Sequence, residues 1–517
     1  MSTILVRTLA VALTGIDAHI VSVETHVGTG VVSFKLVGLP DASVKEARER
    51  VRAALQSCGV DWFERRVTVN LSPAGIPKMG SAFDLAIAVG MLCARNYLTP
   101  DAIADTVFIA ELGLDGSLRP VRGILPAVIG AAKAGIERVI VAASSTEEAA
   151  LVPGITVHGY PHLRDLVSDL GGRMPEPAAS LEADHYQRPR QQRPREDNVD
   201  LADVRGQEFA TRGLIIAAAG GHHIMMIGEP GSGKTMLAKR LPTILPDLED
   251  TDAIDVTALH SIAGTFDSTG GLMRRPPIQT PHHSATMPAI IGGGTAMAVP
   301  GAVSLAHAGV LVLDESAEFS PSVLDSLRQP LESGTISIHR SRARVTYPAR
   351  FQLVLATNPC PCGHAMSRKK QCSCSSIQQR RYLNRLSGPL LDRIDIQVSM
   401  CTPTPAALAE PPPYTSADAR AQVREARARS RHRWRNEPWS LNAHAPSQSI
   451  RTLLGSLEEG IGRGVDDAVN NGVLSLRGAD RVVRIALTIA DLRGSEVSMN
   501  DLALALQYRN GMNHGTP

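Results

Sequence analysis

A glycine-rich loop that ends in lysine and threonine carries the clearest chemical signal in this chain of 517 residues. It fits the spacing G-x-x-x-x-G-K-[ST] at every fixed position, with Gly228, Glu229, Pro230, Gly231, Ser232, Gly233, Lys234 and Thr235. The backbone N–H groups of such a loop can surround the phosphates of a nucleoside triphosphate. Residues 223–227 before it predict a buried strand, and residues 236–240 after it predict a helix. We therefore expect an ATP site formed by a strand, a loop and a helix in succession.

Two acidic residues end a second apolar run and can complete this site. Residues 310–313 are apolar, and Asp314 and Glu315 follow them. We expect Lys234 to reach the β- and γ-phosphates, and Thr235 and Asp314 to hold Mg²⁺. Hydrolysis also needs a base near the attacking water, and Glu315 is the candidate.

A third apolar run, residues 351–357, ends at Asn358. An amide at the end of a neighbouring strand can orient the same water. The alternative is that Asn358 only forms the turn before Pro359.

Four of the seven cysteines lie close together in the sequence, at Cys360, Cys362, Cys372 and Cys374. In a reducing compartment such a cluster indicates a metal rather than disulfides. Four thiolates can form a closed tetrahedral zinc site, although the C-x-C spacing is tighter than the usual one. Basic residues inside the loop would lower the thiol pKa values and favour Zn²⁺. Structural zinc and a loop without metal both remain open.

The elements that must position these residues fall into three blocks. Residues 1–170 show an α+β pattern of mixed order, and residues 200–400 alternate strands and helices around the nucleotide motifs and the cysteine-rich loop 360–374. Residues 401–517 are helical in pattern. Residues 171–199 are rich in Pro, Gln and Arg without apolar periodicity, which predicts a linker. The fold class expected is therefore multidomain α/β.

The composition excludes several classes of protein. Apolar residues make up 43% and charged residues 20%, with a net charge of +2, so a nucleic-acid signal must be local. We find no apolar run long enough to span a bilayer, and the N-terminus is a poor signal peptide. The sequence thus predicts a cytoplasmic protein without a membrane partner.

Several segments resemble an AAA+ ATPase, specifically the magnesium-chelatase-like ComM (YifB-like) competence family. Besides the motifs above, the resemblance is carried by residues 204–207, 281–284, 290–294, 305–310, 327–332 and 358–363. It implies an AAA+ core at residues 200–400 and a helical lid of the magnesium-chelatase C-terminal type at 401–517.

The resemblance also implies two catalytic arginines. Residues 390–395 match the segment that bears the arginine finger, so Arg393 would act in trans on the γ-phosphate bound by a neighbour. Residues 475–478 match the sensor-2 position, so Arg477 would contact the γ-phosphate in cis. The alternative for either is a surface salt bridge. A finger acting in trans implies a homo-oligomeric ring, expected to be a hexamer.

Residues 77–84 and 109–116 resemble the Lon-type protease domain, whose fold is of the ribosomal-S5-domain-2-like kind. That protease uses a serine activated by a lysine. Ser81 lies near the nucleophile position, but residues 121–127, which match the stretch that would carry the lysine, contain none. We therefore expect residues 1–170 to form a non-proteolytic domain.

Two arginine-rich segments are candidates for DNA contact. In the helix predicted after Asp418, a single face carries Arg420, Arg424, Arg427, Arg431 and Arg435. Such a face can neutralise phosphates, and the alternative is a solvated face or one paired with acids of the next subunit. The second segment is a predicted hairpin over 335–347 with Arg340 and Arg342 at its tip, which could grip a phosphate backbone or form a merely polar turn.

The function implied by the resemblance is that of a ring-forming, ATP-dependent DNA motor. It would act on single-stranded or branched DNA as a branch-migration helicase, in homologous recombination or natural transformation. The alternative is a chelatase-type AAA+ remodeller of a protein partner. An ATP-dependent protease is disfavoured because the expected lysine is missing.

Overall fold

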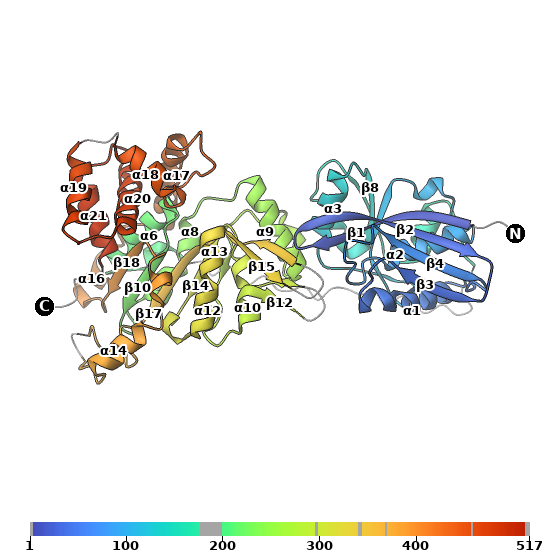
Figure 1. Cartoon of the computed structure of the whole chain (residues 1–517), viewed down its shortest axis with the longest axis horizontal. Coiled ribbons are helices and arrows are strands. Elements are labelled where there is room, and N and C mark those ends of the chain that lie inside the picture. Colours follow the sequence, from blue (N-terminus) through green and yellow to red (C-terminus); the bar gives the residue numbers. More distant parts are fainter. Residues whose placement is uncertain are drawn as a thin grey trace.

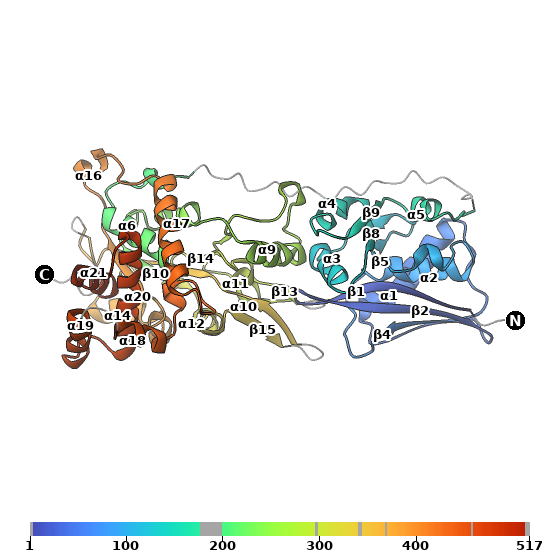
Figure 2. The same cartoon turned by 90° about the horizontal axis from the view of Figure 1, so that it is seen from above.

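The structure is a computed structural model that describes residues 4–175, 199–294, 298–339, 344–367, 370–455 and 459–511. It is elongated, with the N-terminal residues at one end, the nucleotide motifs in the middle and the C-terminal helices at the other end (Figures 1 and 2). Residues 176–198 of the predicted linker, Arg340 and Arg342 lie outside the described residues. Among the helices that are described, none combines the length and the apolar character that crossing a bilayer requires.

The N-terminal part is built on a seven-stranded mixed sheet of order β3-β4-β2-β1-β5-β8-β9. Its strands are β1 (Ile4–Thr14), β2 (Asp17–Gly28), β3 (Ser33–Val37), β4 (Arg66–Ser72), β5 (Thr106–Ile109), β8 (Arg138–Ala142) and β9 (Thr156–Tyr160). Its helices are α1 (Ala42–Ser57), α2 (Asp84–Ala94), α3 (Ile124–Lys133), α4 (Thr146–Ala149) and α5 (Leu163–Asp169). The mixed α+β pattern predicted for this block is confirmed. The apolar helix α2 is buried along its whole length because it packs between the sheet and α1.

The middle part is built on a five-stranded parallel sheet of order β11-β14-β17-β10-β18. The strands are β11 (Ile278–Gln279), β14 (Val310–Leu313), β17 (Gln352–Thr357), β10 (Ile224–Gly228) and β18 (Ile396–Met400). The central three are buried at every residue, as expected of parallel strands covered on both faces. Helices here include α6 (Glu208–Gly220), α7 (Lys234–Ala238), α9 (Asp250–Ala263), α13 (Arg328–Ser333), α14 (Ser376–Leu383) and α15 (Gly388–Leu391). The carboxyl ends of β10, β14 and β17 meet at one edge, where functional side chains gather in such sheets.

The N-terminal part contacts the middle part through apolar packing and hydrogen bonds. Leu13 and Ile16, at the turn between β1 and β2, pack against the apolar cluster that includes Val345 of the hairpin β15–β16 (Thr335–His339 and Arg344–Pro348). Helix α3 packs against α9, and the N–H of Gly123 donates to the carbonyl of Ser261 at 3.3 Å. The two parts are therefore joined by packing as well as by the chain.

The C-terminal part is helical, as predicted. It contains α16 (Pro405–Ala409), α17 (Ser416–Arg433), α18 (Ser447–Leu454), α19 (Glu459–Asn470), α20 (Leu476–Arg493) and α21 (Met499–Arg509). Helices α17 and α20 pack on each other and on α6 of the middle part. This places the first turn of α20 close to the segment that follows α15.

Candidate active site

The glycine-rich loop joins β10 to α7 in the predicted order. Gly231 and Gly233 have φ values of 81° and 93°, a left-handed backbone that glycine adopts without strain. Lys234 begins α7, and its Nζ donates to the carbonyls of Gly228 and Glu229 at 2.7 and 3.0 Å. Burial lowers the pKa of Lys234, while the nearby carboxylates oppose that shift.

The residues expected to hold Mg²⁺ lie together. Thr235 Oγ1 donates to Asp314 Oδ2 at 2.6 Å, across the short gap between α7 and the end of β14. A hydroxyl and a carboxylate at this distance are oxygen ligands of the kind that Mg²⁺ binds. The residues present therefore fit the ion.

Asn358 also belongs to this group. It follows β17, the strand between β10 and β14, and its Oδ1 accepts a hydrogen bond from Lys234 Nζ at 3.2 Å. The three motifs thus meet at Lys234 and Thr235 because their strands are neighbours in the sheet.

Glu315 lies beside a histidine that the sequence analysis gave no role. Its carboxylate is 3.0 Å from Nδ1 of His283, and 54% of the Glu315 side chain is exposed. His283 lies in the segment 281–284, which was noted only as part of the family resemblance, and it follows the edge strand β11. The pairing was not predictable from spacing because it joins two loops of different strands.

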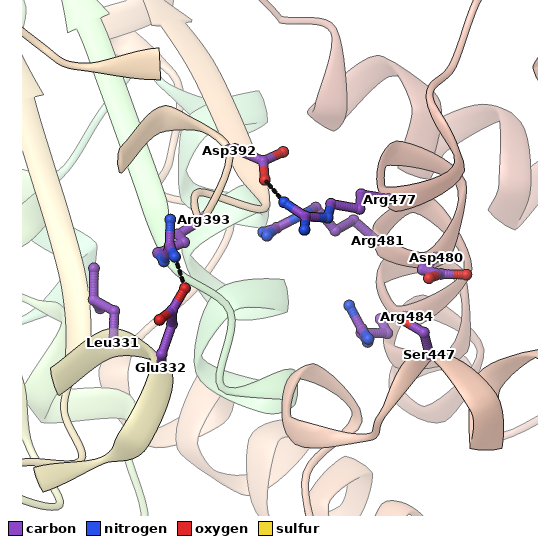
Figure 3. A pocket seen from close by; sticks show the side chains of 9 residues that line it. All are labelled: Leu331, Glu332, Asp392, Arg393, Ser447, Arg477, Asp480, Arg481 and Arg484. Atoms are coloured by element: carbon purple, nitrogen blue, oxygen red, sulfur yellow. Dashed lines mark hydrogen bonds and ion pairs between the residues drawn. The ribbon is translucent and has the colours of Figure 1, made fainter. Parts of the chain in front are cut away.

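Arg393 and Arg477 line a common pocket of about 290 Å³ between the middle part and the helical part (Figure 3). Arg393 forms an ion pair with Glu332 of α13, and Arg477 lies 3.4 Å from Asp392. Partial burial, together with the charges of Arg328, Arg481 and Arg477, lowers the pKa of Arg393. The full lining is Leu331, Glu332, Asp392, Arg393, Ser447, Arg477, Asp480, Arg481 and Arg484, with none from the glycine-rich loop.

A buried polar network fixes the helical part against this pocket. Asp395 accepts from Arg481 of α20 at 2.6 Å and lies 3.1 Å from Nδ1 of His222. Burial alone would raise the pKa of the Asp395 carboxyl, but His222 and Arg481 outweigh it and hold that pKa below its ordinary value.

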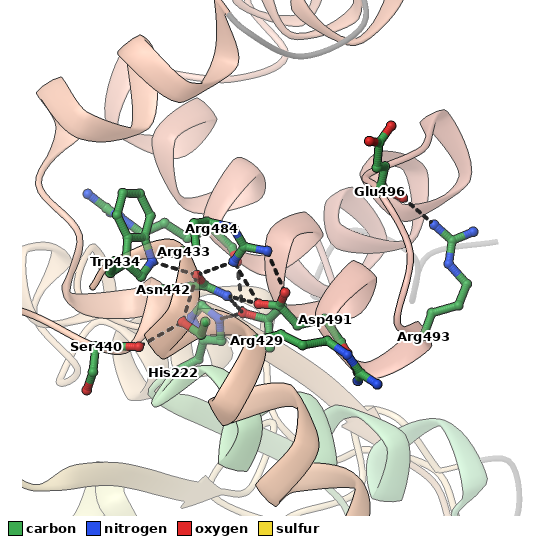
Figure 4. Close-up of polar contacts among 12 residues, drawn as sticks. His222, Arg429, Arg433, Trp434, Ser440, Asn442, Arg484, Asp491, Arg493 and Glu496 are labelled. Atoms are coloured by element: carbon green, nitrogen blue, oxygen red, sulfur yellow. Dashed lines mark hydrogen bonds and ion pairs between the residues drawn. The ribbon is translucent and has the colours of Figure 1, made fainter. Parts of the chain in front are cut away.

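The network continues from His222 through Thr488, whose Oγ1 is 2.8 Å from His222 Nε2, to Asn442 and Asp491. The Asn442 side chain donates to Thr488 Oγ1 at 3.1 Å. It also donates to Asp491 Oδ2 at 2.8 Å (Figure 4). Asp491 also pairs with Arg433 at the end of α17. These contacts hold α17, α20 and the segment before β18 in one arrangement.

The four clustered cysteines lie within reach of one metal ion. Their Sγ atoms are all within 4.8 Å of one another, and three of the pairs are 3.4, 3.5 and 3.7 Å apart. A tetrahedral zinc site with Zn–S bonds of about 2.3 Å has sulfur–sulfur edges of about 3.8 Å. The thiols are free, so the cluster contains no disulfide. The donor set and its spacing fit Zn²⁺.

The arginines of α17 do not form one free face. Arg427 donates from both Nε and Nη2 to the carbonyl of Ala218, at 3.0 and 2.7 Å, and joins α17 to α6. Arg420 pairs with Asp247 and Arg431 with Glu249. Arg424 is exposed. The helix periodicity was correct, but the alternative of pairing with acids applies within the same chain.

Ser81 in the N-terminal part donates a hydrogen bond to the carboxylate of Glu111. The buried Lys78 donates to the carbonyl of Pro73. These partners agree with the expected lack of a serine–lysine pair, which stays a prediction.

Comparison with known families gives three matches along the chain. Residues 200–408 match "Magnesium chelatase, subunit ChlI", residues 23–145 match "Subunit ChlI of Mg-chelatase", and residues 413–509 match "Magnesium chelatase, subunit ChlI C-terminal".

Curated relatives are similar over almost the whole length. "Uncharacterized protein Rv2897c" of Mycobacterium tuberculosis is 43% identical over 504 residues, which cover 97% of this chain and 98% of the relative. "Competence protein ComM" of Haemophilus influenzae is 40% identical, covering 96% and 95%. "Uncharacterized protein YifB" of Escherichia coli is 39% identical, covering 96% of each.

Proposed function

The chain belongs to the magnesium-chelatase-like AAA+ family that includes ComM and YifB, and on that premise we propose that it hydrolyses ATP to move DNA. The observation that supports hydrolysis best is the convergence of Lys234, Thr235, Asp314 and Asn358 at one edge of the parallel sheet. The resemblance to ComM, which is named as a competence protein, supports DNA as the substrate.

The roles of the residues follow from their positions. Lys234 would neutralise the β- and γ-phosphates, and the loop N–H groups would hold them in place. Thr235 and Asp314 would hold Mg²⁺, which shields the charge of the triphosphate. Glu315, displaced from His283, would accept the proton of the attacking water, and Asn358 would orient that water.

We infer that the site is completed by a second copy of the chain. Arg393 and Arg477 share a pocket that no residue of the glycine-rich loop lines. The resemblance implied that Arg477 acts in cis, but its place beside Arg393 favours action on the same neighbouring nucleotide. A closed ring, which we propose to be a hexamer, gives every copy such a neighbour.

Fewer arginines are proposed to contact DNA than the sequence suggested. Arg424 is exposed, Arg420 and Arg431 pair with acids of the same chain, and Arg427 supports the fold. The tip of the hairpin β15–β16 stays a candidate through Arg340 and Arg342, which lie outside the described residues. Contacts of this kind bind the phosphate backbone without reading sequence.

A chelatase-type remodeller is the second candidate, because the family that matches residues 200–408 is that of a magnesium-chelatase subunit. Such a protein would use ATP hydrolysis to change the conformation of a protein partner, and DNA would not change its rate of hydrolysis.

The deciding experiment is the rate of ATP hydrolysis with and without DNA. We expect single-stranded or forked DNA to stimulate hydrolysis by the full chain, and the stimulation to fall steeply with salt as phosphate contacts are screened. A rate unchanged by any DNA structure at low salt would favour the remodeller. A Lys234→Ala variant, expected to bind no nucleotide, gives the background.

We also propose structural zinc at the cysteine cluster. Purified protein should contain about one zinc ion per chain, as a closed four-thiolate site holds one ion. Cys372→Ser protein should lose it, and an unchanged metal content would exclude the cluster as the site.

A further inference from the structure

The cysteine loop lies directly against the glycine-rich loop. A Cβ atom added to Gly363 would be 2.6 Å from Cδ and 2.7 Å from Cγ of Pro230. Such distances are far inside van der Waals contact, so only a glycine allows this approach. Gly363 also has a φ of 80°, which favours glycine independently.

A second contact joins the same two loops. Ser367 donates a hydrogen bond to the Glu229 carboxylate, and this bond is the main reason why the pKa of Glu229 is lowered. The same carboxylate accepts from the N–H of Thr402, after β18, at 3.4 Å. Glu229 and Pro230, two of the variable residues of the phosphate-binding loop, are thus both supported from outside it.

The cysteine loop has little other means of keeping its shape. In its described residues, from Cys360 to Cys374, it contains no helix or strand. Its two arms meet through the four sulfur atoms, and Gln379 of α14 contacts the second arm at Cys372 Sγ, 3.5 Å away. A metal bound there would supply the cross-link between the arms, because thiolate–metal bonds also stabilise the fold around them.

At its N-terminal end, the cysteine loop begins close to the nucleotide site. Cys360 is two residues after Asn358, which contacts Lys234. Cys360 is fully buried, so the first metal ligand is anchored in the core at the end of β17.

We propose that the metal held by the four cysteines supports the phosphate-binding loop, so that nucleotide affinity depends on metal occupancy although no cysteine contacts the nucleotide. Loss of the metal frees the arm that carries Gly363 and Ser367. Pro230 and Glu229 then lose their support, and the loop must be ordered again each time a nucleotide binds. This inference rests on the proposed nucleotide site.

The test measures the Kd of a fluorescent ADP analogue on full-length protein, together with zinc content. Cys372→Ser protein should lose zinc and bind the analogue about fivefold to tenfold more weakly, the effect of losing roughly one hydrogen bond with its packing. Cys401→Ser is the matched control, because Cys401 is exposed, near the same sheet edge and outside the cluster. It should keep both the zinc and the wild-type Kd.

Ser367→Ala separates the contact from the metal. It should keep its zinc and weaken binding by about twofold to threefold, since one hydrogen bond is lost while the arms stay joined. If the Cys372→Ser protein loses zinc and binds the analogue as tightly as the wild type, the inference is wrong.

Hydrogen–deuterium exchange provides a readout that does not depend on nucleotide. Stripping zinc from the wild type should speed exchange in peptides covering residues 224–240 and leave those of the N-terminal sheet unchanged. Unchanged exchange in 224–240 overturns the inference even if Cys372→Ser protein does not fold. If the wild type binds no analogue at all, the proposed function fails. The exchange experiment still tests whether the metal supports the phosphate-binding loop.

Discussion

Glu315 adopts an uncommon backbone conformation at the residue where hydrolysis is proposed to occur. Its φ of 51° is left-handed, which disfavours residues with a side chain and costs of the order of 1–3 kcal/mol. The conformation turns its carboxylate toward His283. Strain of this kind persists only where the surroundings enforce it, and active sites are common places for it.

Replacing Glu315 with glutamine should separate binding from hydrolysis. The amide keeps the size of the side chain but cannot accept the proton of water, so turnover should fall by about 10²–10⁴-fold while nucleotide binding is retained. Phosphate release and analogue binding measure the two effects. Glu318→Gln, three residues along the chain, is the control and should keep its turnover. Near-normal hydrolysis by Glu315→Gln protein would exclude Glu315 as the base.

Arg393→Ala should leave nucleotide binding intact and lower turnover by about 10³-fold or more, because an arginine finger stabilises charge that develops in the transition state. Arg328→Ala, a nearby arginine paired with Asp325, serves as the control for loss of a positive charge. Equal turnover by both variants would remove the assignment of the finger.

The sequence predicted those site residues that follow buried strands. Asp314 and Asn358 were found because an apolar run ending in a polar side chain is typical of a parallel strand. His283 and Glu332 were missed because their partners, Glu315 and Arg393, come from other elements. Periodicity correctly predicted an arginine face on α17, but it could not show that Arg427 contacts the Ala218 carbonyl.

At the level of elements, the contact between α20 and the segment after α15 determines where the arginines stand. Arg481 lies one turn along α20 from Arg477, and it is bound to Asp395, two residues after Arg393. The two proposed catalytic arginines are therefore held at a fixed separation by one buried ion pair. This long-range contact could not be derived from the helix pattern alone.

Asp395→Ala should loosen the helical part without unfolding the sheet. Removing one partner of a buried pair leaves the charge of Arg481 uncompensated, which costs about 3–5 kcal/mol. Hydrogen exchange in α20 should become faster, and exchange in the N-terminal sheet should not change. Equal protection of α20 in both proteins would contradict the role given to this pair.

The Asp395 carboxylate should also make the stability of the helical part depend on pH. Since its folded pKa is lowered, Asp395 stabilises the protein above the unfolded value of about 3.9, and that stability is lost as the pH falls through the folded pKa. Acid should therefore increase exchange in α20 by a larger factor in the wild type than in Asp395→Ala protein, which already lacks the carboxylate. Exchange in α20 measured over a series of pH values below 5 tests this difference.

At the scale of the whole molecule, the middle part lies between the N-terminal part and the helical part (Figures 1 and 2). The turn between β1 and β2 contacts the cluster that includes the hairpin β15–β16. Val345 is next to Arg344, which forms the last pair of the hairpin before its turn, so the N-terminal part packs near the turn end of a hairpin proposed to touch DNA. The mixed and parallel sheets were predictable from the sequence as α+β and α/β blocks. The contact between the β1–β2 turn and the hairpin was not, because the few apolar residues that form it, such as Leu13 and Ile16, make no recognisable pattern.

Mixing two inactive variants tests whether one site uses two copies. Lys234→Ala lacks the phosphate-binding lysine and Arg393→Ala lacks the finger, so each alone should be inactive. In a ring mixed at random in equal amounts, half of the chains keep the lysine and half of their neighbours keep the finger. About a quarter of the sites should then hydrolyse ATP. No recovery after mixing would show that Arg393 serves its own chain.

If the pocket shared by Arg393 and Arg477 serves the nucleotide of a neighbouring copy, a mutation in one copy affects the activity of another. A copy damaged in that pocket would silence the nucleotide of the next copy while its own remained intact, so the fault would appear one position away from its cause. A mutation there would therefore be dominant, because damaged copies would inactivate the sites of normal copies beside them. Diluting the normal protein until its copies separate would also abolish hydrolysis, because each site would then lack the arginine of a neighbour.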